Sequence, residues 1–583
     1  MKNSGENLKS GFSHFNESIF SAKEISGLGK AGTVKLLKGG IARVLNFIGN
    51  LFSYTSTRVY GFFLLAFGFA SLFMQLAQYY FVENAEIAFS SLITGFAVVL
   101  LSVPFLIFDQ PISIALQSNP VTDYILFEFL LIKRSRRNVE HITVPPLLAI
   151  FLGIAFASFG FLIPLYYVVL IAFAAIFSIV ALTTPEFSMI TTLLFLPYVS
   201  FFKEYTEIIF ILLSAMIIIS FLIKVVVGKR VYNFNVYDIL VFLLIILLIV
   251  SGALGNGASL KGSIVISVML LASICASNLV VNRRIADCAV KAVIFSSVPV
   301  AILSIIEFIF EFPGKENPFL DGISVFFSFP MAFSAFLLVA SILSLTLFLE
   351  KKQKYKKIFY FVVFALELAI LIMLMQPTLW LTVILTFMAG VVIVSKKIPI
   401  DIIFIIVLLP LLIFLIPAQF LDTVSDIFGI LPSFSEKIAG YSEALNVWLD
   451  NIVIGVGRGN SALHLNMLLG LGVEFGVVAL AIVALLILLR LRHLSYYRHY
   501  IRNSLVYTST GMTSIATVAL LILGFDTYIF ADYSVLLLFS MIFAITTSTI
   551  RTAKKEYNDR SEYYGDSSSS VSSAVDIGIN KNF

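Results

Sequence analysis

The stretch from Asn235 to Leu254 reads NVYDILVFLLIILLIVSGAL and contains one charged residue, Asp238. About 20 nearly uncharged residues are enough for a helix to cross the ~30 Å hydrocarbon core of a membrane. A backbone in lipid must satisfy its own hydrogen bonds, which favours a helix for such a stretch. A strand of a membrane barrel would alternate apolar and polar residues over about ten positions, whereas this run is continuous. The stretch therefore predicts one transmembrane helix.

Similar runs recur along the chain, and the overall composition agrees with them. Of the 583 residues, 59% are hydrophobic and 13% are charged, whereas a soluble protein carries about 25% charged residues. A soluble multidomain enzyme and a disordered protein are thereby excluded. The sequence predicts an all-α polytopic integral membrane protein with about 14–16 transmembrane helices. The predicted spans are 60–81, 86–107, 144–162, 164–182, 186–202, 206–227, 235–254, 263–281, 286–310, 323–350, 358–375, 378–394, 399–417, 464–490, 506–525 and 532–550.

The basic residues predict the orientation of these spans. When the N-terminus is placed in the cytoplasm, nearly all Lys and Arg residues fall in inner loops. Those left in outer loops are Lys203, Lys261, Lys315, Lys437 and Arg458. This is the positive-inside bias of membrane proteins. Both termini are therefore predicted to be cytoplasmic, and the excess of 39 basic over 34 acidic residues indicates topology rather than nucleic-acid binding.

The composition also divides the chain into regions. The first 58 residues are polar, with an amphipathic pattern near 41–48, and do not have the form of a cleavable signal peptide. The tail is Ser-rich and is expected to be disordered. Two short spans, around Pro164 and after Pro185, can alternatively be re-entrant or interfacial segments. The predicted regions are 1–58 (cytoplasmic), 59–417 (membrane helices with an inner loop at 108–143), 418–463 (outer loop), 464–551 (last three membrane helices) and 552–583 (cytoplasmic tail).

The long outer loop ends in a glycine-rich turn, Gly455-Val456-Gly457-Arg458-Gly459-Asn460. Glycines permit a positive φ and a close approach of the backbone. Successive exposed N–H groups in such a turn can bind an anion, and an arginine would add a fork-shaped charge. The turn does not match a dinucleotide fingerprint or a P-loop. The alternative interpretation is a glycine turn that caps a helix re-entering the membrane.

His464 follows this turn and is the one histidine predicted on the outer side. Imidazole has an unperturbed pKa near 6.5, which suits a general base at neutral pH. The alternative interpretation is a histidine that packs at the start of a helix at headgroup level. Cys275 and Cys288 lie in no CxxC or Cys/His pattern, so no metal or cofactor is predicted.

Several residues of this region together form a family pattern. They are Trp448, Asp450-Asn451, the glycine-rich turn, His464, Asn466 and Glu474-Phe475-Gly476. The set resembles the C-terminal signature of the O-antigen ligase and O-antigen polymerase superfamily. That resemblance, over about 430–480, implies a glycosyltransferase of the bacterial cytoplasmic membrane. Such enzymes take a glycan from an undecaprenyl-diphosphate carrier at the outer face and pass it to a glycan or lipid acceptor, with inversion and without a metal.

The resemblance also implies roles for particular residues. His464 would be the catalytic base, and Arg458 would contact the diphosphate. The other residues of the predicted substrate site are Gly455, Gly457, Gly459, Asn460, Asn466 and Glu474. The implied partners are membrane lipid, the lipid-linked glycan donor and the acceptor, with no nucleic acid.

Two other functions remain open from the sequence. Leu465 separates His464 from Asn466, whereas the family pattern has histidine and asparagine adjacent. Arginines that many members carry near 326–332 and 376–380 are absent. These departures favour a catalytically impaired relative that binds partners in envelope polysaccharide assembly. A polysaccharide or lipid transporter is the third possibility, because Glu367 falls inside a predicted span, where carboxylates are costly.

Overall fold

The computed structural model describes residues 43, 49–50, 53–81, 89–132, 134, 145–159, 165–228, 230–255, 257–311, 327–351, 353–374, 377–394, 402–408, 434–459, 466–501, 507–525, 527–552 and 555. Within these ranges the fold is helical, and its only β-type pairing is an isolated bridge between Ser56 and Pro111. The all-α class predicted from the sequence is thus confirmed for the described residues. The predicted amphipathic segment near 41–48 and the Ser-rich tail lie almost entirely outside them.

The long helices overlap the spans predicted from the sequence. In chain order the elements are α3 (Thr57–Phe81), α4 (Phe89–Ile107), α5 (Ile112–Ser118), α6 (Pro120–Thr122), η1 (Asp123–Phe129), α7 (Pro146–Ser158), α8 (Leu165–Thr183), α9 (Pro185–Phe195), η3 (Leu196–Tyr205), α10 (Thr206–Val226), α11 (Val236–Leu254), α12 (Gly257–Leu279), α13 (Arg283–Glu311), α15 (Pro330–Glu350), α16 (Lys354–Met373), α17 (Pro377–Val394), α18 (Ile402–Leu408), α20 (Phe434–Asp450), α21 (Met467–Ile501), α22 (Tyr507–Gly524) and η6 (Ile529–Ala531). A last helix covers Tyr533–Thr552.

Nine of the helices in the described ranges are long and apolar enough to cross a membrane. The same part of the chain contains five shorter apolar helices, including Ser91–Ile107 and Thr510–Gly524. These lengths and compositions are those of a multi-pass membrane protein. Several helices begin at a proline, among them α7, α9, α15 and α17. Proline suits a first helical position because its missing N–H would have no helical partner there.

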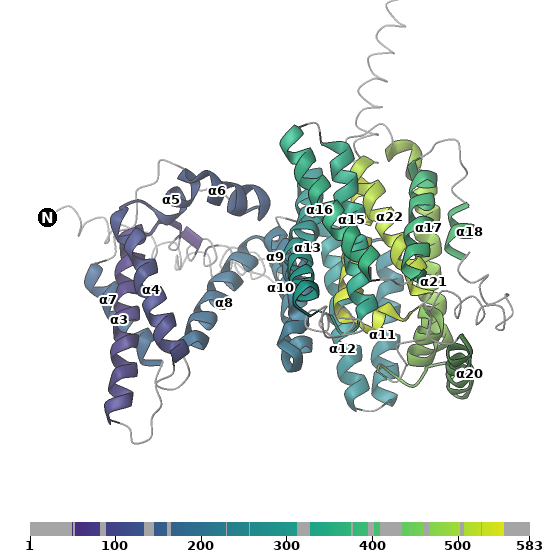
Figure 1. Ribbon diagram of the computed structural model, residues 1–583, viewed down its shortest axis with the longest axis horizontal. Coiled ribbons are helices and arrows are strands. Elements are labelled where there is room, and N and C mark those ends of the chain that lie inside the picture. Colours follow the sequence, from purple (N-terminus) through teal and green to yellow (C-terminus); the bar gives the residue numbers. More distant parts are fainter. Residues whose placement is uncertain are drawn as a thin grey trace, which may run out of the picture. The chain divides into compact units, whose positions relative to one another are not determined.

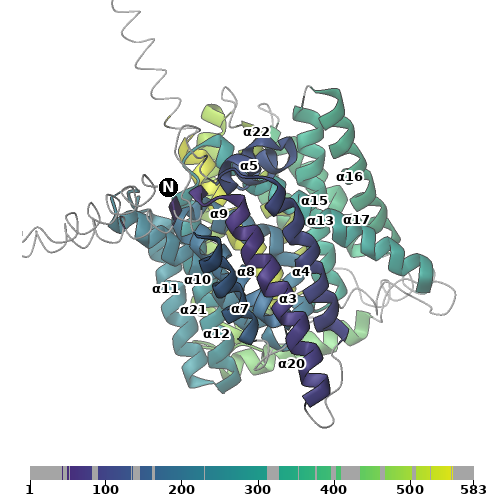
Figure 2. The same cartoon turned by 90° about the vertical axis from the view of Figure 1, so that its left-hand side faces the viewer.

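The chain divides into two compact units, and the first consists of Met1–Phe187 with Ile219–Val231. In this unit α3 packs along α4 and α7, and α3 and α4 run side by side in Figure 2. Small residues permit this close packing. A Cβ at Gly68 would lie 2.6 Å from Val99 Cγ2 of α4, and one at Gly153 of α7 would lie 2.6 Å from the carbonyl oxygen of Phe63. Glycine contacts of this kind are typical of helix packing in membranes.

The second unit consists of Ser188–Ile218 with Tyr232–Phe583. Figure 1 shows α15 among the helices of this unit, and it packs against α13, α16 and α22. α11 packs on α12 and α21, and α20 lies against α21. The innermost helices are Ser259–Leu279, Pro330–Glu350 and Tyr533–Thr552. In each of them 78% of an apolar 18-residue stretch is buried, compared with 33% in Val236–Leu254. The core of the unit therefore lies along these three.

α21 is the one long helix of this unit that is interrupted by a non-helical residue within the described part of the chain. Gly476 has φ 78° and ψ 177°, so Met467–Phe475 and Val477–Ile501 are two helical pieces. The sequence predicted one continuous span at 464–490, which was wrong at this residue. The break frees backbone groups within an apolar helix, and these groups need partners.

Candidate functional site

The partners of the broken helix come from the glycine-rich turn. The N–H groups of Val456 and Gly457 donate to the carbonyl oxygens of Val473 and Glu474, each at 2.8 Å. The N–H of Val477 donates to the carbonyl oxygen of Ile452, also at 2.8 Å. The turn therefore runs along the break and replaces hydrogen bonds that the helix has lost. Within a membrane such replacement is required, because no water is present to satisfy free backbone groups.

Glycines make this close approach possible. A Cβ at Gly455 would lie 2.6 Å from the carbonyl carbon and oxygen of Glu474. A Cβ at Gly476 would lie 2.2 Å from the carbonyl oxygen of Val453. Both residues also have positive φ, 76° and 78°, a backbone conformation that residues other than glycine rarely adopt. The helix break and the turn are thus fitted to each other backbone against backbone.

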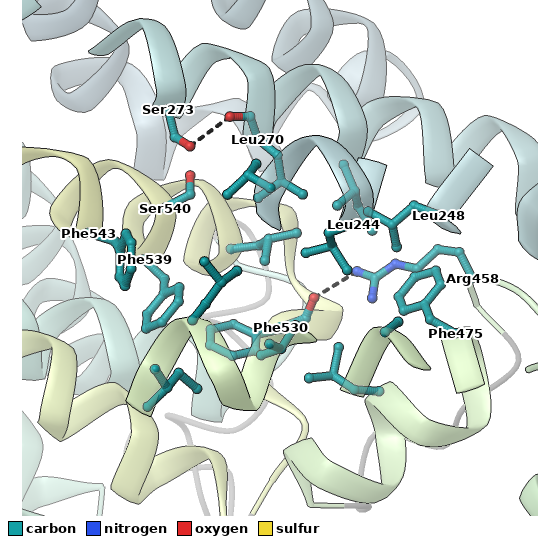
Figure 3. Close-up of a pocket in the computed structure, with 18 of the residues that line it drawn as sticks. Leu244, Leu248, Leu270, Ser273, Arg458, Phe475, Phe530, Phe539, Ser540 and Phe543 are labelled. Atoms are coloured by element: carbon teal, nitrogen blue, oxygen red, sulfur yellow. Dashed lines mark hydrogen bonds between the residues drawn. The ribbon is translucent and has the colours of Figure 1, made fainter. Parts of the chain in front are cut away.

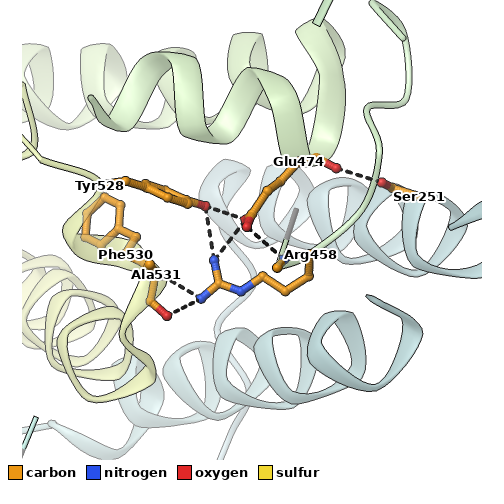
Figure 4. A network of polar contacts seen from close by, with 7 residues as sticks. Ser251, Arg458, Glu474, Tyr528, Phe530 and Ala531 are labelled. Atoms are coloured by element: carbon orange, nitrogen blue, oxygen red, sulfur yellow. Dashed lines mark hydrogen bonds and ion pairs between the residues drawn. The ribbon is translucent and has the colours of Figure 1, made fainter. Parts of the chain in front are cut away.

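Arg458 and Glu474 form a buried ion pair at the same point. Arg458 Nη1 lies 2.9 Å from Glu474 Oε2, and the two side chains are 6% and 2% exposed. Nη1 also donates to the Tyr528 hydroxyl at 3.1 Å, and that hydroxyl donates to Glu474 Oε2 at 2.6 Å. The second terminal nitrogen, Nη2, donates to the carbonyl oxygens of Phe530 at 2.8 Å and Ala531 at 2.7 Å (Figure 4). We call these residues, with Gly459, the Arg458 network.

The carboxylate of Glu474 has donors on both of its oxygens. Oε1 accepts from the N–H of Gly459 at 2.9 Å, and Oε2 accepts from Arg458 and Tyr528. The backbone carbonyl of Glu474 accepts from Gly457 and from the Ser251 hydroxyl, the latter at 3.0 Å. The anion that Gly459 and Arg458 bind in this structure is therefore the side chain of Glu474.

The surroundings keep both polar partners of Glu474 in their protonated forms. Burial alone would lower the pKa of Arg458, but the carboxylate of Glu474 outweighs burial and raises that pKa overall. Burial raises the pKa of Tyr528 well above its usual 10, and the negative charge of Glu474 raises it further. Removing one partner of such a buried ion pair strongly destabilises a protein, because the other charge stays buried without compensation.

The remaining residues predicted for the site separate into three groups. Gly455, Gly457 and Gly459 lie in the turn described above. Asn466 precedes α21, and its Oδ1 accepts from the N–H of Leu469 at 2.8 Å, which is the position of a helix N-cap. His464 and Asn460 lie outside the described residues, so their predicted roles remain predictions.

Tyr528 had no signal in the sequence, whereas Trp448 belongs to the family-like pattern and Asp532 precedes a helical run. Tyr528 comes from the short connection between α22 and the last helix, 54 residues from Glu474. Trp448 of α20 packs its indole on Gly472 of α21, where a Cβ would lie 2.8 Å from the ring. Asp532 did carry a signal, because an aspartate before a helical run is a typical N-cap. Its Oδ1 accepts from the N–H of Ser534 at 2.7 Å, and its Oδ2 accepts from the N–H of Ser328 at 2.9 Å.

A second, exposed ion pair lies near the Arg458 network. Lys261 of α12 pairs with Glu207 of α10 at 2.6 Å, and the lysine side chain is 61% exposed. The next residue, Gly262, has no space for a side chain, because a Cβ there would lie 2.7 Å from Arg458 Cγ and 3.0 Å from the Tyr533 hydroxyl. Tyr533 also lies against Arg458, with its ring centroid 5.2 Å from Arg458 Cζ. An accessible cation thus lies beside the buried one.

An apolar cavity extends from the Arg458 network between α11, α12, α21 and the last helix. It has a volume of about 110 Å³ and is lined mostly by leucine, isoleucine, valine and phenylalanine. Figure 3 shows Arg458 at one end and Phe543 at the other. Its two serines, Ser273 and Ser540, donate to carbonyl oxygens of their own helices. The cavity therefore presents an almost wholly hydrocarbon surface.

In the described part of the chain, no three His, Cys, Asp or Glu side chains gather at one point where a metal ion could bind. Comparison with protein-family models gives no match, and comparison with curated proteins gives none either.

Proposed function

We propose that the protein transfers or polymerises a glycan carried on undecaprenyl diphosphate, at the outer face of the bacterial cytoplasmic membrane, in the manner of the O-antigen ligase and polymerase superfamily. In this proposal both termini are cytoplasmic, and the glycine-rich turn faces outward. One observation carries it. Arg458, Gly459 and Glu474, which belong to the family-like pattern, meet in one buried network at the break of α21.

The proposal gives the Arg458 network a positioning role. Both terminal nitrogens of Arg458 are engaged by protein oxygens, so Arg458 holds the turn rather than the diphosphate. His464 follows the turn by four residues and is the proposed base. In the reaction it takes the proton of an acceptor hydroxyl, whose oxygen bonds to the anomeric carbon of the donor. The bond from that carbon to the diphosphate oxygen breaks, and undecaprenyl diphosphate leaves with the electron pair.

The leaving diphosphate needs a cation, and Lys261 is the proposed contact. Its ammonium group is largely exposed and is held beside the network by Glu207 and Gly262. A lysine acts on phosphate as a point charge, without the geometric demands of an arginine fork. This assignment replaces Arg458, which the sequence had indicated for that role.

A second function is favoured by the same engagement of Arg458. A chain whose buried arginine is used internally can bind the lipid-linked glycan, or an assembly partner, without turning it over. This alternative is a catalytically impaired relative, and it predicts binding of the donor with no release of undecaprenyl diphosphate.

The two functions are separated by a transfer assay on the purified full-length protein in lipid vesicles. The donor is undecaprenyl-diphosphate-linked glycan from membranes of the source organism, and the readouts are undecaprenyl diphosphate released and lengthened glycan. Loss of a general base costs about 10²–10⁴-fold, so we expect His464→Ala to lose at least about a hundredfold. His141→Ala, predicted to lie on the opposite side of the membrane, is the matched control. Equal turnover in both variants, or none in the wild type, would contradict the catalytic proposal.

A further inference from the structure

The face of α21 that lines the apolar cavity continues to a buried arginine. Ala479, Val483, Leu486 and Ile487 line the cavity, and their spacing of three and four residues places them on one side of the helix. Arg490 is the next position on that side. Ala479 to Ile487 is about 12 Å of helix. Arg490 follows them and lies against Phe543, which lines the end of the cavity opposite Arg458, although Arg490 is not itself a lining residue.

Arg490 is buried without an anionic partner among the described residues. Arg490 is 4% exposed. Its Nη2 donates to the carbonyl oxygen of Phe543 at a long 3.4 Å, its guanidinium lies 5.0 Å from the Phe543 ring, and Tyr237 is a further hydrogen-bond partner. Nη1 is buried and has no hydrogen-bond partner in the described part of the chain. A buried charge is costly unless it is paired and hydrogen-bonded.

Phe543 connects this cation to the cavity. The ring of Phe543 lines the cavity at the end away from Arg458. The guanidinium of Arg490 packs against the same ring. Arg490 also lies within two residues of the end of the apolar part of its helix, which the structure places at Arg492. Basic positions between helices at this level of a membrane are where anionic lipid headgroups bind.

We propose that an anionic phospholipid binds here, with its phosphate paired to Arg490 and part of one acyl chain in the cavity between α11, α12, α21 and the last helix. Two complementarities carry the assignment. The unpaired guanidinium requires an anion, and the lining beside it accepts hydrocarbon, since both cavity serines are already bonded within their helices. A dry apolar cavity of this order of size accepts an apolar guest rather than water. The site is independent of the glycosyl-transfer proposal, because it uses neither His464 nor the Arg458 network's polar groups.

The test measures lipid retention by native mass spectrometry of the full-length protein in detergent, after addition of phosphatidylglycerol, phosphatidylcholine with the same chains, palmitate or inorganic phosphate. Wild type is expected to retain phosphatidylglycerol about tenfold better than phosphatidylcholine, because the choline cation of phosphatidylcholine balances the charge of its own phosphate and adds a positive charge beside Arg490. Arg490→Gln should lose this preference. Arg492→Gln, an exposed arginine two residues away on the same helix, should keep it. Equal retention by wild type and Arg490→Gln would overturn the proposal, and so would a preference for palmitate or for inorganic phosphate over phosphatidylglycerol.

A second variant keeps Arg490 in place and alters only the cavity. Ala479→Phe fills the space from α21, and its matched control is Val478→Phe, because Val478 is 38% exposed on the neighbouring side of the helix. Ala479→Phe should weaken phosphatidylglycerol retention several-fold while Val478→Phe retains it. Unchanged retention in a folded Ala479→Phe variant would overturn the placement of the acyl chain.

Discussion

The two buried arginines at opposite ends of the apolar cavity solve the same electrostatic problem differently. Arg458 is paired with Glu474 and donates to a tyrosine and two carbonyl oxygens. Arg490 makes one long hydrogen bond to a carbonyl oxygen, a hydrogen bond with Tyr237 and a contact with the ring of Phe543. Its Nη1 has no hydrogen-bond partner in the described residues. The first arginine is satisfied by the protein itself and so holds the fold together. The second retains the capacity to bind an anion from outside.

The largest expected effect is at Arg458. Arg458→Met leaves the Glu474 carboxylate buried without its counter-charge, which costs about 3–5 kcal/mol of stability. Adding Glu474→Leu removes the stranded charge, so the double variant should recover a large part of the loss. Unfolding temperature of the detergent-solubilised protein measures both. A double variant as unstable as the sum of the single ones would show that the two side chains do not act as a pair.

The next largest loss of stability is expected at the break of α21, where the Arg458 network lies. Gly476→Ala places a Cβ 2.2 Å from the carbonyl oxygen of Val453 at a positive φ, and we expect it to cost about 2–3 kcal/mol. Gly511→Ala in α22 is the control, because no atom of the described residues outside its own turn of helix lies within 4 Å of its new Cβ. Gly511→Ala should be neutral or slightly stabilising by helix propensity, about 1 kcal/mol at most. Equal unfolding temperatures for the two variants would argue against a tight contact between turn and break.

Tyr528 should make the Arg458 end sensitive to alkali. Its pKa is raised in the folded protein, first by burial and then by Glu474, so the folded chain keeps a proton that the unfolded chain loses above about pH 10. The associated stability is complete below that pH and falls as the pH rises further. Tyr528→Phe should lower stability by about 1–2 kcal/mol at pH 8 and flatten the fall between pH 9 and 11. A variant that keeps the wild-type slope would assign the alkaline loss to another group.

The smallest effect is expected at the other arginine. In lipid-depleted detergent, Arg490→Gln should lower stability by less than about 1 kcal/mol or raise it, because it removes a costly buried charge and leaves no counter-charge stranded. The measurement is again the unfolding temperature, with Arg492→Gln beside it. A loss as large as that of Arg458→Met would reveal an internal partner for Arg490.

Much of the fold follows from the sequence, because apolar runs report directly on burial in lipid. The long helices overlap the predicted spans, and the stretch 235–254 became α11 (Val236–Leu254). The break at Gly476 could not be predicted, since glycine is also common inside membrane helices. It depends on the contact with Val453 and Ile452, which lie more than 20 residues earlier in the chain.

The candidate site was predicted in its membership more than in its chemistry. The sequence brought Arg458, Gly459 and Glu474 together through a family resemblance, and the structure places them in contact. It predicted a free arginine, because nothing local indicates that Tyr528 and the carbonyl oxygens of Phe530 and Ala531 would occupy it. Arg490 was expected at the inner end of the predicted span 464–490, among the basic residues of the inner loop that follows, and instead it is buried in α21. Charge patterning predicts which side a residue lies on, but not whether a neighbouring helix covers it.

One measurement tests the contrast between the two arginines most directly. The unfolding temperature of wild type, Arg458→Lys and Arg490→Gln is recorded in detergent, with and without added phosphatidylglycerol. We expect the lipid to stabilise wild type and Arg458→Lys by the same increment and to leave Arg490→Gln unchanged, while Arg458→Lys starts from a lower value in both conditions. Equal stabilisation of all three proteins by phosphatidylglycerol, or its loss in Arg458→Lys alone, would contradict the account.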